Sequence, residues 1–179
     1  PVQKLSDLRN KELIVAATGS GADSLTYPVI LRDLFHLKLR IVQGYPGSRD
    51  MNLAVERGET DGICGLSWST LKASNPDWIQ NKRLNVLVQT GSKPHFELPD
   101  VPILVDLVKN ENDRRVVDLI SFSEDMGRPF VMPPGTPKEM VIATRRAFDA
   151  TMKDAAFLED ARRAMQEVDP LTGEEMEAS

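Results

Sequence analysis

One stretch of this chain constrains its fold more than any other. Residues 38–62 have the pattern of a strand, a tight turn, a helix, a glycine and a second strand. The apolar run through Ile41 and Val42 ends at Gly44, and Gly58 stands where a helix needs a left-handed residue after its last turn. A unit of this kind leaves backbone N–H groups of a helix N-terminus at the carboxyl end of a strand, where a small anion can be held.

The same arrangement occurs at two other places in the chain. Residues 13–18 form an apolar run followed by the polar turn 19–24, and residues 61–65 lead into a third turn that ends near Ser69. Strands that alternate with helices indicate βαβ units, whose right-handed crossovers bring the turns to one edge of a parallel sheet. We therefore expect an α/β fold with a mostly parallel sheet flanked by helices. In such sheets ligands bind beyond the carboxyl ends of the strands.

Less regular segments follow these three units. Apolar content predicts a buried strand over residues 84–90, and residues 127–132 are a further candidate strand. A long helical stretch is expected after residue 103, which the charged segment 110–115 can interrupt. Two more helices are expected between residues 136 and 165.

Composition excludes several classes of protein. Lys and Arg number 22 against 27 Asp and Glu, a formal charge of −5, and no basic run is present. Nucleic-acid binding is therefore not expected, because phosphate contacts need clustered Lys and Arg. The single cysteine, Cys64, excludes an internal disulfide and a cysteine-based zinc site. No metal-ligand spacing occurs, and we expect neither a metal nor a cofactor.

The ends of the chain and its hydropathy add two expectations. No apolar run reaches the length of a membrane span. The chain begins at Pro1, and no signal peptide precedes its first amphipathic segment. We expect it to be a fragment or a processed product of a longer protein.

The first polar turn has two possible interpretations besides a plain tight turn. Residues Gly19–Ser24 resemble the start of a dinucleotide-binding fingerprint, but Ser24 replaces the third glycine and no acidic residue follows the next strand. A turn that holds a small anion through its N–H groups fits the residues better.

The third turn resembles a catalytic motif incompletely. Residues Gly65–Ser69 are one residue short of the nucleophile elbow Gly-x-Ser-x-Gly, with Ser67 as its nucleophile. The two histidines, His36 and His95, stand in an amphipathic helix and in a proline-rich loop, positions more typical of surface residues than of catalytic bases. We therefore expect a binding protein rather than an enzyme. A hydrolytic enzyme that uses Ser67 and a ligand-sensing domain remain as alternatives.

An ordered set of motifs carries a family resemblance. Thr18–Gly21, Gly44–Ser48, Glu56–Gly62, Pro99–Pro102 and Arg128–Pro137 follow one another over nearly the whole chain. This set resembles the receptor proteins of tripartite tricarboxylate transporters, the Bug-like family of extracytoplasmic solute-binding proteins.

The resemblance implies a fold, a function and a location. Its members have two α/β lobes of the type II periplasmic-binding-protein kind, which close on a small organic acid or a related carboxylate-bearing solute and pass it to membrane permease subunits. On this interpretation residues 1–127 form the second lobe, and residues 128–179 are a crossover strand and helices that return to a largely missing first lobe. The implied location is periplasmic, and a homo-oligomer through exposed C-terminal helices is a further expectation. The candidate ligand-binding residues, all on the three turns, are Thr18, Ser20, Gly21, Ala22, Asp23, Ser24, Tyr45, Gly47, Ser48, Cys64, Ser67 and Trp68.

Overall fold

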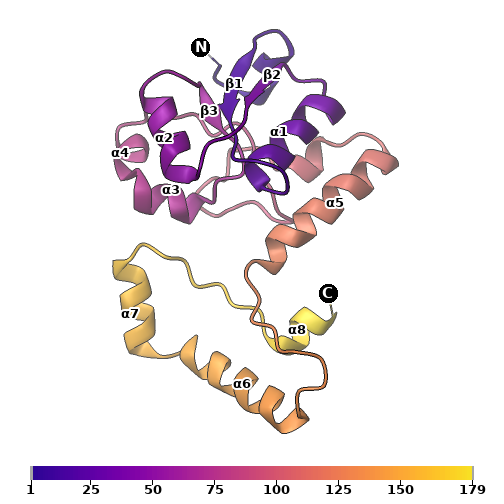
Figure 1. The fold of residues 1–179 in the computed structure, drawn as a ribbon, viewed down its shortest axis with the longest axis vertical. Helices are drawn as coiled ribbons and strands as arrows, with labels where there is room; N and C mark the ends of the chain where they lie inside the picture. The colour runs from indigo at the N-terminus through magenta and orange to yellow at the C-terminus, as the bar shows by residue number, and fades with distance from the viewer. Residues whose placement is uncertain (1, 179) are drawn as a thin grey trace.

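The computed structural model describes residues 2–178 and divides into an α/β part and a helical C-terminal arm (Figure 1). The elements in chain order are the 3-10 helix η1 (Leu5–Arg9), β1 (Leu13–Ala16), α1 (Asp23–Leu34), β2 (Leu39–Val42), α2 (Ser48–Glu56), β3 (Gly62–Ile63), α3 (Trp68–Ser74), α4 (Pro76–Gln80), the 3-10 helix η2 (Leu104–Leu107), α5 (Glu111–Met126), α6 (Lys138–Thr151), α7 (Ala155–Arg163) and α8 (Gly173–Ala178).

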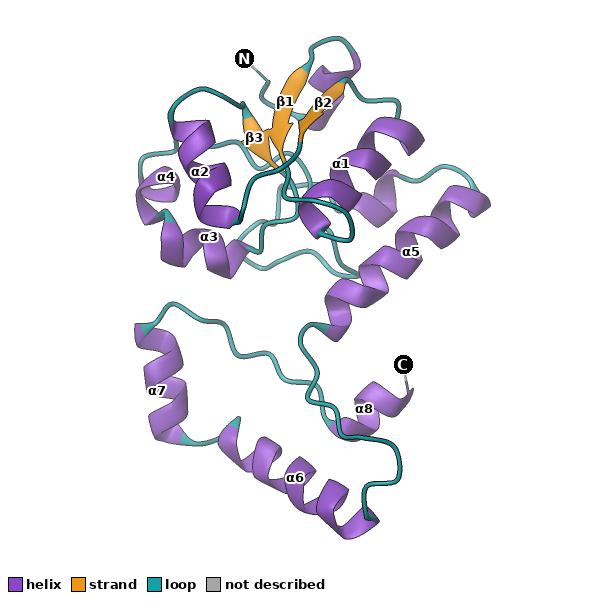
Figure 2. Ribbon diagram, viewed as in Figure 1, coloured by secondary structure: helices purple, strands orange, loops and turns teal. Residues whose placement is uncertain are grey.

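The three strands form one parallel sheet in the order β2-β1-β3. β1 pairs along its whole length with β2, from Leu13 opposite Leu39 to Ala16 opposite Val42, and more briefly with β3. Helices α1 and α2 flank the sheet (Figure 2), which explains why the central strand is a continuous apolar run. The expected α/β fold with a parallel sheet is confirmed.

The core lies between the sheet and elements far along the chain. Leu8 of η1 is 1% exposed, and Val15, Leu104 and Val117 are equally inaccessible. They join η1, β1, η2 and α5 into one apolar cluster. Burying an aliphatic side chain of this size stabilises the fold by roughly 1.5–3 kcal/mol. Asp61, just before β3, links this strand to β1, because its carboxylate accepts the Ile14 N–H at 2.8 Å.

The strand predicted over residues 84–90 is wrong. Gln89 makes a single parallel bridge to Ile103 instead of a ladder. Leu87 and Val88 still pack against the core cluster. The segment is only half-buried, and apolar content alone does not provide a neighbouring strand to pair with.

The candidate strand over residues 127–132 is wrong for a similar reason. Helix α5 ends at Met126, Gly127 follows with a φ of +60°, and the next residues run as irregular chain. Phe130 is 85% exposed, and no strand within residues 2–178 lies beside it. The long helical stretch after residue 103 is also divided, because Asn110 caps a new helix by accepting the Asp113 N–H at 2.9 Å.

The helices of the C-terminal arm, residues 128–178, do not pack against the α/β part. Figure 1 shows α6 and α7 apart from the helices around the sheet, and the three helices of the arm bury no side chain. Arg145 of α6 pairs with Glu174 and Glu177 of α8, so the arm has ionic contacts of its own. A search of the described residues for a helix long and apolar enough to cross a membrane finds none.

Candidate functional site

The three predicted turns meet at one edge of the sheet. Because the strands are parallel, the turns that follow β1, β2 and β3 all leave from the carboxyl ends of the strands. The first two turns are joined by backbone hydrogen bonds, from Gly44 N to Thr18 O at 2.9 Å and from Tyr45 N to Ala17 O at 3.3 Å. These bonds extend the β1–β2 ladder into the turns.

Gly65 brings the third turn onto the start of α1. It has a φ of +67°, and a Cβ at this position would lie 2.5 Å from the carbonyl carbon of Asp23 and 2.7 Å from the amide nitrogen of Ser24. A glycine is needed both for the left-handed backbone and for this close approach. The first turn therefore touches both of the others.

The Thr18 and Ser24 hydroxyls of the first turn are bonded to one another. The Ser24 Oγ lies 2.9 Å from Thr18 Oγ1 and accepts the Thr18 N–H at 3.1 Å. Ser24 is 5% exposed, so its hydroxyl is not open to a ligand. Ser20, Gly21 and Asp23 are exposed at the same turn, and Ala22 is half-buried.

Two helix N-termini at this edge have no side-chain cap. Ala22 precedes α1 and Gly47 precedes α2, and neither residue has a side-chain oxygen for the first-turn amides, although the Ala22 carbonyl accepts the Leu25 N–H at 2.9 Å. Ser48 is exposed as the first residue of α2, beside the half-buried Tyr45 and Gly47. Amide groups in this position are satisfied by water or by an anion, and the helix dipole favours the anion.

The residues of the third turn have partners within the protein. Ser67 caps α3: its Oγ accepts the Thr70 N–H at 3.3 Å and donates to Thr70 Oγ1 at 2.6 Å. Within the described residues no histidine or carboxylate is hydrogen-bonded to this hydroxyl, which a serine nucleophile would need. Burial raises the pKa of the Cys64 thiol to about 12, so the thiol stays protonated and unreactive at neutral pH.

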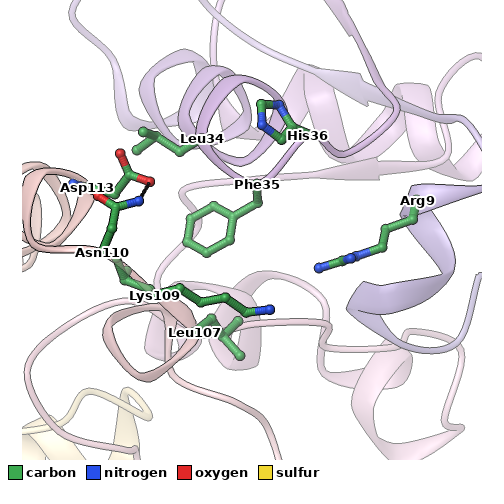
Figure 3. A pocket seen from close by; sticks show the side chains of 9 residues that line it. Arg9, Leu34, Phe35, His36, Leu107, Lys109, Asn110 and Asp113 are labelled. Carbon is green, nitrogen blue, oxygen red and sulfur yellow. Dashed lines mark hydrogen bonds between the residues drawn. The ribbon is translucent and has the colours of Figure 1, made fainter.

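Neither of two surface hollows is lined by the first two turns. The larger, about 460 Å³, lies between the ends of η1 and α1 and the start of α5; there Arg9 and Lys109 extend toward one another beside Phe35 (Figure 3). This is the amino edge of the sheet, opposite the turns. A smaller hollow of about 320 Å³ is lined by Trp68, with Trp78 and the segment after α4. Of the candidate ligand-binding residues, Trp68 alone lines either hollow.

Sequence analysis missed a cluster of charged side chains beside Trp68. We call it the Lys72 cluster; it consists of Lys72, His95, Glu97 and Glu167. The Lys72 Nζ donates to Glu97 Oε2 and to Glu167 Oε1, each at 2.6 Å, and the His95 Nε2 lies 2.9 Å from Glu167 Oε2. The Trp68 indole N–H donates to the Glu97 carboxylate as well. No local pattern could reveal this cluster, because its members are up to 95 residues apart.

The electrostatics of the Lys72 cluster favour its charged form. Partial burial disfavours the Lys72 ammonium, but its hydrogen bonds to Glu167 and Glu97 outweigh this and raise its pKa. The bond from Lys72 is the main cause of the lowered pKa of Glu97. Burial opposes the charge of Glu167, yet its bonds to Lys72 and His95 still lower its pKa. Three members, His95, Glu97 and Glu167, are close enough to share a metal ion, but the Lys72 ammonium already pairs with both carboxylates and would repel a divalent cation.

Comparison with known proteins places the fold. A scan against protein-family models and a search of curated protein sequences both give no match. Among solved structures, the crystal structure of a TctC solute-binding protein from Polaromonas, determined without ligand, matches 97% of this chain with a TM-score of 0.64 and 15% identity. The chain spans 55% of the length of that protein. At this identity the likeness is one of fold, and at that level it confirms the resemblance drawn from the sequence.

Proposed function

We propose that this chain is the ligand-binding lobe of a solute-binding receptor of the tripartite tricarboxylate type. The observation that carries the proposal is the meeting of three small-residue turns at one edge of a parallel sheet, with the N-termini of α1 and α2 uncapped there. The fold shared with a TctC solute-binding protein supports it.

The proposed ligand is a small organic acid. Its carboxylate would accept hydrogen bonds from the first-turn amides of α1 and α2, near Ser20 and Ser48, where the helix dipoles favour negative charge. The solute would be bound and released unchanged, in keeping with the bonding of Ser67 to Thr70.

The proposal extends to the rest of the receptor. Residues 1–127 would form one lobe, and residues 128–179 would return to the other. The protein would act in the periplasm and deliver its solute to membrane permease subunits. Contact between copies through the exposed apolar side chains of the arm is a further part of the proposal.

Calorimetric titration of the full chain with succinate and citrate, with sulfate as a comparison, tests the proposal. The Ser48→Asp variant should bind the carboxylates at least tenfold more weakly, because it places a negative charge at the proposed anion position. An acidic residue in a first helical turn is itself favourable, so the fold should be retained. The matched control is Asn112→Asp, which adds the same charge to the first turn of α5 near the opposite edge of the sheet. Failure of the unmodified chain to bind any carboxylate, or its conversion of the carboxylate to a product, would overturn the proposal.

A further inference from the structure

A carboxylate of this protein is already held in the way that a bound organic acid would be. Both oxygens of Glu167 accept hydrogen bonds: Oε1 from the Lys72 ammonium at 2.6 Å and Oε2 from the His95 Nε2 at 2.9 Å. Glu167 belongs to the segment between α7 and α8, whereas both donors belong to the α/β part. Two directed donors of this kind, one of them cationic, form a carboxylate-binding pair.

The His95 donor is positioned without help from Glu167. The Glu97 backbone N–H donates to the His95 Nδ1 at 3.1 Å, which assigns the imidazole proton to Nε2, the atom that faces Glu167. The loop that carries His95 is held in place by the side chain of Gln89. Its oxygen accepts the His95 N–H at 2.7 Å, and its NH₂ group donates to the Leu98 and Val101 carbonyls. Removal of Glu167 would therefore leave the imidazole N–H pointing at the same place.

The Lys72 donor is also held from within the α/β part. Lys72 stands one helical turn after Trp68 on α3, and both side chains donate to the Glu97 carboxylate. The Lys72 side chain is 21% exposed. Glu97 thus keeps the ammonium in position while leaving its other N–H groups for a second carboxylate.

The contact of Glu167 with this pair has little else to support it. Within residues 128–178 no side chain is buried, so little apolar burial accompanies the ionic contact. A partly exposed ion pair contributes little stability on its own. A free carboxylate could replace Glu167 and form the same two hydrogen bonds.

We propose that Lys72 and His95 are a carboxylate-binding site that Glu167 of the C-terminal arm occupies, so that a ligand carboxylate and the arm compete for it. The site takes a small organic acid. Because Trp68 stands in the third turn, at the start of α3, the site lies beside the edge proposed above for ligand binding. The inference rests on the proposed function and adds to it a second set of ligand-binding residues and a built-in competitor.

Calorimetric titration of the full chain with succinate tests the competition. Glu167→Gln should bind succinate ~10-fold more tightly if the arm fills the site about nine-tenths of the time, since apparent affinity scales with the fraction of free site. The matched control is Glu159→Gln, which removes a charge from the arm where it pairs with Arg162 inside α7. Its dissociation constant should equal that of the unmodified chain.

Substitution of the donor then separates the inference from the proposed function. Lys72→Met in the Glu167→Gln background should abolish the gain, and Lys72→Arg should retain most of it because the positive charge is kept; circular dichroism checks that each variant folds. Succinate affinity that responds to Ser48→Asp but to neither Glu167→Gln nor Lys72→Met would overturn this inference and leave the proposed function standing. Absence of succinate, citrate and sulfate binding from every variant would overturn both.

Discussion

Replacement of Gly65 by alanine tests the close approach that joins the third turn to α1. The added Cβ would lie 2.5 Å from the Asp23 carbonyl carbon, 2.7 Å from the Asp23 oxygen and 2.7 Å from the Ser24 nitrogen. All three are backbone atoms, so no side chain can rotate away to make room. Either the turn or the first residues of α1 must shift.

The expected loss of stability has two parts. An alanine held in the left-handed region costs about 1–2 kcal/mol relative to its preferred backbone conformation. Overpacking against fixed atoms adds about 1–3 kcal/mol. Gly65→Ala should therefore destabilise the protein by about 2–5 kcal/mol, a large share of the 5–15 kcal/mol that a typical domain has.

Gly58→Ala is the matched control for this prediction. Gly58 has a φ of +72°, close to the +67° of Gly65, but nothing lies within 4 Å of the position of its Cβ. Both variants lose the same backbone freedom in the unfolded chain, so this contribution cancels in the comparison. Guanidinium unfolding followed by circular dichroism should show Gly65→Ala to be less stable than Gly58→Ala by about 1–3 kcal/mol. Equal losses in the two variants would refute the placement of the third turn on α1.

Two further predictions concern the core and the single thiol. Leu8→Ala should cost about 2–5 kcal/mol of unfolding free energy, because Leu8 is 1% exposed, whereas Leu53→Ala, at a position 40% exposed, should change it by less than about 0.5 kcal/mol; similar losses would contradict the core described above. Cys64 should react with iodoacetamide at pH 8 at least ~10-fold more slowly in the folded than in the guanidinium-unfolded chain, because desolvation of the half-buried thiol raises its pKa. Since this pKa is raised from 9.0, the stabilising contribution of the protonated thiol is present below pH 9.0 and is lost as the pH rises toward 12. Equal reaction rates in the folded and unfolded chains, or a free energy of unfolding that does not change over that pH range, would contradict the raised pKa.

The parallel α/β fold could be predicted from the sequence because its signals are local. The apolar run of β1, the turn after it and the periodicity of α1 all lie within about one unit, and Gly58 takes the left-handed conformation that its position predicted. Because βαβ crossovers are right-handed, the three turns must lie at the same edge of the sheet. The same local signals failed at residues 84–90 and 127–132, where apolar side chains have no partner strand within the described residues.

The details of the candidate site depended on tertiary contacts that no local pattern carries. Ser24 and Ser67 were predicted from their place in polar turns, and the structure shows both hydroxyls bonded within the protein. Lys72 and His95 had no signal in the sequence that tied them to Glu167, because the partner of a long-range ion pair is set by how the chain returns in space. The sequence by itself therefore determined the βα units and the edge of the sheet at which their turns lie. Only the tertiary structure decided which polar groups at that edge are already paired, because hydrogen-bond partners are chosen by distance in the folded chain and not by distance along it.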